Sequence, residues 1–176
     1  MASADELHAS LPVEFQDAKA VGGKGLKVYA LSKPLSLKLS DACDLVVPFS
    51  PGVFNGKGNE ERVNICFTIS DEWVDAVKRL EGVCKEKVGE STWASCIKET
   101  EGYAPLLKAK LQLTGEKACK YYDDEGRSTS MPLSWNRIQC NAIISVRGIY
   151  FAGTSTGLQL DVTHIQYCPK IEASPF

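Results

Sequence analysis

This chain has few of the residues on which enzyme active sites and metal centres are usually built. It contains two histidines, His8 and His164, and its seven cysteines form no Cys-x-x-Cys pair. We find no nucleophile elbow, no paired-carboxylate motif and no His-x-x-x-His spacing. These absences predict that the protein is not an enzyme and holds neither a metal nor another cofactor. We interpret His164 as a strand residue satisfied by a backbone partner.

Long apolar runs are also absent. No window approaches the roughly 18 continuous apolar residues of a membrane span, and residues 1–8 lack the basic region and apolar stretch of a secretory signal. Several cysteines lie inside apolar runs, as Cys66 and Cys140 do, which is typical of reduced structural thiols. We therefore expect an intracellular protein, in the nucleus or at a viral replication site if its source is eukaryotic or viral.

A strong net charge of either sign is missing as well. The formal net charge is −2, which argues against a protein that coats duplex DNA by electrostatics alone. Residues 1–102 carry 12 Lys+Arg and 16 Asp+Glu, a net of −4, whereas residues 103–176 carry 8 and 6, a net of +2. A locally basic face on an acidic protein is compatible with single-strand binding, because base stacking supplies part of that affinity.

The sequence is rich in strand patterns. Apolar and polar residues alternate over 35–40, 63–70 and 106–113, which indicates strands with one buried face. Ser70 precedes two acids in a helix-capping pattern. The stripe that follows at helical spacing is Trp73, Val77, Leu80, Cys84 and Val88. A second short helical piece is predicted over 91–100, with Trp93 and Ile97 inward.

The final third predicts further strands. Segments 117–122 and 127–131 are predicted to form a hairpin across Asp123–Gly126, a sequence typical of tight turns. Three more strands are expected over 138–146, 149–151 and 158–167, with a bulge near His164 where the alternation breaks. The predicted fold class is therefore mainly β (α+β), an OB-like five-stranded Greek-key barrel with an inserted helix and extra strands.

One domain accounts for the whole length. We expect a flexible arm over residues 1–24, ending in a Gly-rich joint without the spacing of a phosphate-binding loop. Residues 25–170 form the single OB-like β-barrel domain, and residues 171–176 a short C-terminal tail.

The predicted strands carry cations and aromatics on their outer faces. In the strand from Leu106, the side chains of Lys108 and Lys110 share the polar face. The hairpin that follows adds Lys117, Lys120 and Arg127, with two tyrosines between them. This mixture suits a single-stranded nucleic acid, because phosphates require positive charge and unpaired bases require flat apolar surfaces.

Four C-terminal stretches also carry a resemblance to a known family: 106–110, 121–126, 144–151 and 156–166. They resemble the leucine-lysine strand, the acidic-glycine turn and the glycine-isoleucine closing hairpin of the OB-fold single-stranded-DNA-binding proteins of large nucleocytoplasmic DNA viruses and related phages. The match covers about the last 65 residues. Many members end in an acidic tail, whereas 171–176 contains one acid, so the resemblance does not extend to partner recruitment through a tail.

The resemblance implies sequence-nonspecific single-stranded DNA binding in replication, repair or recombination, with replication proteins as further partners. The residues implied to neutralise phosphates are Lys108, Lys110, Lys117, Lys120, Arg127 and Arg137. Those implied to stack bases are Tyr121, Tyr122, Trp135 and Tyr150. Because Tyr121 and Tyr122 are adjacent in a strand, one of the two faces the core, and the sequence does not say which.

Two alternatives stay open: a protein–protein interaction module, and a capsid or coat β-barrel without nucleic-acid binding. The salt dependence of binding distinguishes these alternatives from single-stranded DNA binding. Affinity for a single strand falls steeply as the salt concentration rises, whereas affinity across a hydrophobic protein interface changes little. The sequence leaves open whether the ligand is DNA or RNA, and whether the protein is a monomer or a dimer.

Overall fold

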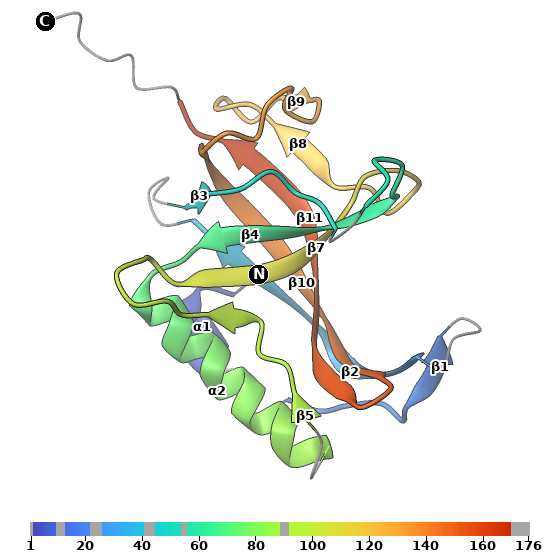
Figure 1. The fold of residues 1–176 in the computed structure, drawn as a ribbon. Helices are drawn as coiled ribbons and strands as arrows, with labels where there is room; N and C mark the ends of the chain where they lie inside the picture. The colour runs from blue at the N-terminus through green and yellow to red at the C-terminus, as the bar shows by residue number, and fades with distance from the viewer. Residues whose placement is uncertain are drawn as a thin grey trace, which may run out of the picture.

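A computed structural model describes residues 2–9, 13–21, 26–40, 45–53, 56–88 and 92–169. It is mostly β, with a helix inserted between strands of one mixed sheet (Figure 1). The helices are α1 (Ala4–Ala9) and α2 (Asp71–Val88). The strands are β1 (Lys19–Val21), β2 (Leu26–Leu39), β3 (Val46–Val47), β4 (Arg62–Thr68), β5 (Thr92–Trp93), β6 (Ile97–Lys98), β7 (Leu106–Gln112), β8 (Lys120–Tyr122), β9 (Ser128–Thr129), β10 (Ile138–Ala152) and β11 (Ser155–Tyr167).

The strands β10 and β11 form a long antiparallel hairpin that crosses the molecule (Figure 1). The sequence predicts two strands in place of β10, divided at Arg147; the structure has one continuous strand with a register shift between Val146 and Gly148. Gly148 has φ +143°, and a Cβ there would lie 1.9 Å from the carbonyl oxygen of Tyr29. Glycine is therefore needed where β10 passes against β2. The predicted bulge near His164 is confirmed by a second register shift.

The main path of the sheet is β1-β2-β10-β11-β7-β4. The short strand β3 pairs with β10 and also lies beside β4, where the backbone N–H of Val46 donates to Thr68 Oγ1 at 3.0 Å. It thus bridges β10 and β4, two strands that are separated along the main path. The predicted class, a mainly β fold with an inserted helix and extra strands, is confirmed.

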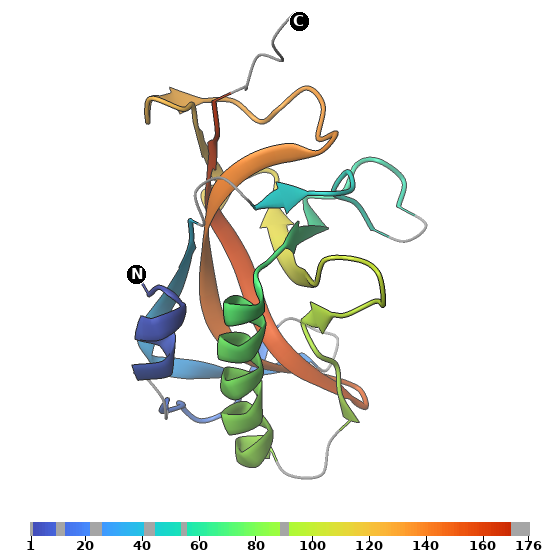
Figure 2. The same ribbon diagram turned by 90° about the vertical axis from the view of Figure 1, so that its left-hand side faces the viewer.

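The helix α2 begins where its sequence predicts. Ser70 Oγ accepts the backbone N–H of Trp73 at 3.4 Å, so the predicted cap is present. The expected stripe packs inward, with Leu80 and Cys84 fully buried. Figure 2 shows α2 running alongside the lower half of the β10–β11 hairpin. The helix therefore covers one end of the core and leaves the β8–β9 end to the strands.

The helix predicted over 91–100 is wrong in the described part of that segment. Trp93 belongs to β5, which pairs in parallel with β11, and Ile97 belongs to β6, which pairs with β7. The backbone N–H of Ala94 donates to the carbonyl of Thr156 at 2.7 Å. Tertiary pairing with sheet edges has overridden the local helical pattern. Ile97 is buried, as expected.

The N-terminal segment, expected as a flexible arm, is packed in its described parts. Leu7 on α1 is fully buried, α1 packs against α2, and β1 pairs with β2. These residues pack against the edge of β2 and against α2, and the periodicity of the sequence did not reveal these partners. The expected Gly-rich joint, 22–25, and the C-terminal tail, 171–176, lie outside the described residues.

The cysteine expectation holds for five residues, which are free and partly or fully buried: Cys66, Cys84, Cys96, Cys119 and Cys140. It fails for Cys168, which is disulfide-bonded. Within the described ranges, no helix is long and apolar enough to cross a membrane, and no group of three or more His, Cys, Asp or Glu side chains is placed to hold a metal ion.

Candidate nucleic-acid interface

The two lysines of β7 lie on the outer face of the sheet, as predicted. Lys108 and Lys110 are exposed, while Leu107, Ala109 and Leu111 between and beside them are buried. β7 pairs with β4 on one side over its whole length. On the other side it pairs with β6 at Leu106 and Leu107, and with β11 at only two later positions. The two cations therefore stand beside a gap between β7 and β11.

That gap is a cleft of about 400 Å³. It brings together three of the predicted residues, Lys108, Lys110 and Tyr150, whose half-buried ring comes from β10. It also contains polar side chains that sequence reasoning missed, which are Arg62, Asn64, Ser95 and Gln159. We call this hollow the β7–β11 cleft.

A carboxylate is paired with one of the residues that line the cleft. Asp161 on β11 is ion-paired with Arg62 on β4, and its other oxygen accepts Nε of Arg147 on β10 at 3.1 Å. In the sheet, Asp161 is the register partner of Lys110. Three cations from three strands thus gather around one anion, which leaves a net positive charge on this part of the face.

Lys110 sits in the middle of this group. Its ammonium donates to the side-chain oxygen of Asn64. Partial burial lowers the pKa of Lys110, nearby Arg62 lowers it further, and Asp161 acts in the opposite direction. A phosphate entering the cleft would favour the charged form of this lysine in the same way as Asp161 does.

The sequence carried a signal for two of the missed residues. Arg62 and Asn64 occupy the outward positions of the strand whose inward residues, Val63 and Ile65, were identified by alternation. The same argument that placed Lys108 outward places them outward too. Nothing local indicates that Arg147 and Asp161, 14 residues apart in the sequence, form an ion pair.

The wall of the cleft near Ser95 is anchored by a buried acid. Glu81 on α2 is 3% exposed, and its two oxygens accept the Ser95 hydroxyl and the backbone N–H of Cys96, both at 2.8 Å. A buried carboxylate is costly unless it is hydrogen-bonded in this way. The helix thereby fixes the β5–β6 segment that lines the cleft.

The structure decides between the adjacent tyrosines. Tyr121 is buried, stacked with Tyr167 and edge-on to Trp135, each at 6.3 Å between ring centroids. Burial raises the pKa of its phenol, whose oxygen has no hydrogen-bond partner among the described residues. Tyr121 is therefore a core residue that is not available for base stacking. The half-buried Trp135 packs against the same core.

Tyr122 points the other way. Its half-buried ring stacks on His164 at 6.0 Å between centroids and 19° between planes. Nδ1 of His164 lies 2.9 Å from the hydroxyl of Thr163, so its hydrogen-bond partner is a side chain and not the expected backbone group. Burial lowers the pKa of His164, and neighbouring Lys120 lowers it further.

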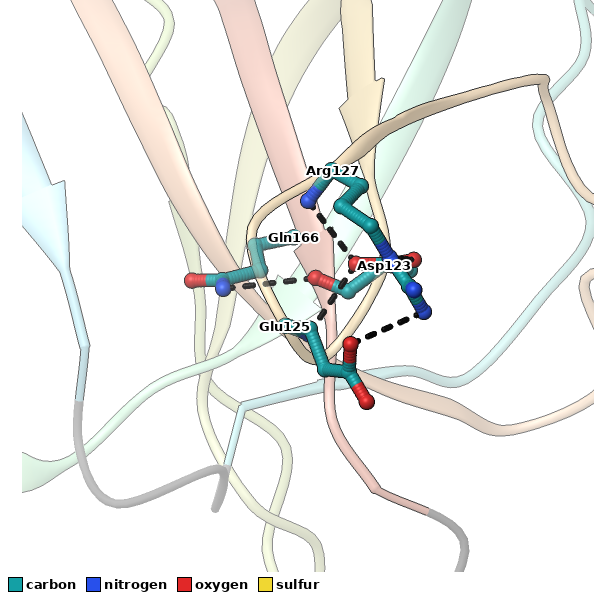
Figure 3. Close-up of polar contacts among 4 residues, drawn as sticks. All are labelled: Asp123, Glu125, Arg127 and Gln166. Carbon is teal, nitrogen blue, oxygen red and sulfur yellow. Dashed lines mark hydrogen bonds and ion pairs between the residues drawn. The ribbon is translucent and has the colours of Figure 1, made fainter.

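Arg127 forms ion pairs with two acidic side chains at the tip of the β8–β9 hairpin (Figure 3). Its guanidinium pairs with Asp123 at 2.8 Å and with Glu125 at 3.0 Å. The backbone N–H of Arg127 is the largest cause that lowers the pKa of Asp123. Gln166 on β11 in turn donates to the carbonyl of Asp123 at 3.3 Å. Two carboxylates already neutralise Arg127, so its contact set favours a turn-stabilising role over a phosphate contact.

The remaining predicted cations are dispersed. Lys117 and Lys120 are exposed, and Lys120 on β8 is the register partner of His164. Arg137 is exposed just before β10, has φ +48°, and lines a different hollow together with Leu133 and Tyr167. The structure thus gathers Lys108, Lys110 and Tyr150 in one cleft, and leaves Lys117 and Arg137 apart from it.

Comparison with known proteins supports the fold assignment. No protein-family model matches the chain, and no curated protein matches it in sequence. Among solved structures, the single-stranded DNA-binding protein from bacteriophage Enc34 in complex with ssDNA is similar at 14% identity and a TM-score of 0.50, covering 89% of this chain and 96% of that one. A C-terminal truncation of the Enc34 protein is 12% identical with a TM-score of 0.50, and the match covers 89% of this chain and 95% of that one.

A protein from another phage gives the same result. The single-stranded DNA-binding protein gp2.5 of bacteriophage T7 is 10% identical with a TM-score of 0.50, and the match covers 81% of this chain and 91% of gp2.5. At these identities the likeness is one of fold. It confirms the OB-like fold that the sequence predicts.

Proposed function

We propose that this protein binds single-stranded DNA without a fixed target sequence, along the outer face of β11. The observation that carries the proposal is the β7–β11 cleft, where Lys108, Lys110 and Arg62 surround a hollow that also contains a half-buried tyrosine. The phage proteins with the same fold are named for this activity. The fold and the residues of this cleft support the proposal independently.

The roles of the residues are physical, and no bond is made or broken. Lys108, Lys110, Arg62 and Arg147 would neutralise phosphates, each contact releasing counterions from the strand. Tyr150 in the cleft and Tyr122 on β8, which pairs with β11 at Gln166, would stack bases, at roughly 1–3 kcal/mol per base. Gln159 and Gln166 are seven positions apart on β11, a length of roughly 23 Å at the rise of a strand. That length suits a few nucleotides.

The biological setting follows from the class. A protein of this kind would act in replication, repair or recombination, inside the cell and together with replication proteins. Its relatives would include the single-stranded-DNA-binding proteins of large nucleocytoplasmic DNA viruses as well as those of phages. RNA is the other ligand compatible with the cleft, because no described contact distinguishes a 2′-hydroxyl. A competition between DNA and RNA strands of one sequence separates the two.

A protein-binding surface is the second candidate function. The observation that favours it is the loop after β9, where Leu133 is fully exposed and Met131 is 44% exposed. Exposed large apolar side chains that lie close together mark contact sites more often than scattered ones. This loop lies apart from the cleft, so a partner protein and a DNA strand would not compete for it.

The test of the proposed function is fluorescence anisotropy with a labelled oligonucleotide of about 30 nucleotides, single-stranded and as a duplex, at low and moderate salt. We expect tight binding to the single strand that weakens steeply with salt, and much weaker binding to the duplex. Absence of binding to the single strand at low salt would remove the nucleic-acid proposal and leave the protein-binding surface as the leading one.

A further inference from the structure

The chain between β3 and β4 forms an arch along the edge of β4 that faces away from β7 (Figure 1). At one end of the arch, the backbone N–H of Val46 donates to Thr68 Oγ1 at 3.0 Å. At the other end, Gly52 and Asn64 exchange two backbone hydrogen bonds, of 3.0 and 2.9 Å. Both ends are therefore held on β4. We call residues 48–51 the β3–β4 arch.

Phe49 lies at the apex of the β3–β4 arch. Six residue steps separate Val46 from Gly52, whereas their partners on β4, Thr68 and Asn64, are only four steps apart. The two extra steps force the arch to bulge away from the strand, and the chain bends at Phe49, halfway along it. Prolines at positions 48 and 51 restrict the backbone on either side. The ring is thus presented by a loop with little conformational freedom.

The ring of Phe49 is available to a ligand. Its residue is 61% exposed, and within the described part of the chain it neither belongs to the hydrophobic core nor stacks on another ring. A single exposed apolar side chain is common on protein surfaces and needs no partner. What an exposed ring can bind therefore depends on the groups that lie next to it.

The β3–β4 arch lies next to the cations of the β7–β11 cleft. Asn64, which is bonded to the arch, lines the cleft and accepts the ammonium of Lys110. Cys66, the next outward residue of β4, is the register partner of Lys108. Because neighbouring strands lie about 4.8 Å apart, two strand spacings, roughly 10 Å, separate β7 from the arch. A strand held at the two lysines can therefore bring an adjoining nucleotide to Phe49.

We propose that Phe49 stacks a base of the bound strand, so that the binding site continues from the β7–β11 cleft across β4 to the β3–β4 arch. This inference rests on the proposed function, because its ligand is the single strand held in the cleft. A phenyl ring carries no hydrogen-bonding group, so it stacks on any base and adds affinity without selecting a sequence. The bases of a duplex are paired and stacked on each other, so Phe49 favours single strands.

Phe49→Ala tests the stacking contact by anisotropy, with a single strand of about 20 nucleotides at moderate salt. We expect affinity to fall about fivefold to tenfold, with the slope of log K against log salt unchanged because no charge is removed. Phe49→Leu keeps an apolar side chain without a flat ring and should lose nearly as much, whereas Phe49→Tyr should bind like the wild type. Tyr103→Ala is the matched control: it removes an exposed ring from the β6–β7 turn and should leave affinity unchanged.

Two further probes report on the base itself. A strand of abasic nucleotides keeps the phosphates and lacks the bases, so the wild type and Phe49→Ala should bind it equally. Phe49→Trp places an indole at the apex of the arch. Its fluorescence should be quenched by a single strand, saturating together with the anisotropy, and should change little with duplex.

The inference and the proposed function fail in different ways. Unchanged affinity in folded Phe49→Ala and Phe49→Leu would overturn the inference alone. So would full affinity in Phe49→Leu beside a loss in Phe49→Ala, or an equal loss on the abasic strand, since neither is expected of stacking. If the wild type binds no single strand at low salt, the proposed function itself is wrong.

Discussion

Lys110 and Asp161 are register partners on the parallel strands β7 and β11, so a cation and a carboxylate lie side by side where the two strands separate. Asp161 also pairs with Arg62 and Arg147. An anion of the protein thus occupies a place among the cations that we propose for phosphates. A bound strand has to share these cations with Asp161 or displace it.

Asp161→Asn tests this competition. Removing the carboxylate frees two guanidinium groups and raises the local positive charge, so we expect affinity for single-stranded DNA to rise about threefold to tenfold at low salt and less at high salt. Both arginines are more than one third exposed, so the loss of stability should be about 0–1 kcal/mol. Glu99→Gln, which removes a carboxylate that is ion-paired with Lys78 on α2, is the control and should leave affinity unchanged.

Lys108→Ala combined with Lys110→Ala tests the phosphate contacts. Each lost contact should reduce the slope of log K against log salt by about 0.7, so the double variant should bind more weakly with a slope about 1.4 smaller. Titrations at four or five salt concentrations measure this slope. Arg79→Ala removes an exposed cation from α2 and should leave the slope intact. An unchanged slope in the folded double variant would mean that the strand does not contact β7.

Arg127→Ala tests whether this arginine stabilises the hairpin. We expect affinity for single-stranded DNA to change less than twofold, because two carboxylates already hold the guanidinium. In an NMR titration, the pKa of Asp123 should lie below its ordinary value in the wild type and rise part of the way back in the variant, since the backbone N–H of residue 127 remains. The hairpin should therefore lose stability as pH falls through the lowered pKa. A large loss of affinity would restore Arg127 as a phosphate contact.

Gly148→Ala tests the crossing of β10 and β2. The added Cβ would meet the Tyr29 carbonyl at 1.9 Å in a backbone conformation that L residues rarely adopt, so we expect about 2–4 kcal/mol less stability in urea unfolding. Gly82→Ala in α2 has open space at its Cβ and should raise stability by up to about 1 kcal/mol. Equal stability of the two variants would show that β10 does not pass β2 as closely as described.

The regular elements could be predicted from the sequence because one face of each is buried. Alternation located β7, with Leu107 and Leu111 inward, and helical spacing located α2, with Leu80 inward. Where a segment is held by a partner distant in the sequence, local pattern was insufficient. Trp93 pairs with a strand more than 60 residues later, and this pairing replaced the predicted helix.

The candidate site was predictable in part for the same reason. Outward lysines of β7 follow from alternation, but the ion pairs of Asp161 depend on which strands become neighbours. The sequence did not show which of the adjacent Tyr121 and Tyr122 faces the core. The contacts with Trp135 and Tyr167 show that Tyr121 does. The ion pairs of Arg127 with Asp123 and Glu125 were not predicted, because the sequence showed a turn there but not how its side chains pair.

The most direct test of the account is to map where a single strand lies on the protein. A DNA strand containing 4-thiothymidine, cross-linked by ultraviolet light and analysed by peptide mass spectrometry, should label the peptides of β7 and β11 and the peptide of Tyr150. Excess unlabelled single strand should suppress that labelling, and duplex should not. Labelling concentrated on α2 or β1, or no labelling that single-stranded competitor can suppress, would contradict the proposed face.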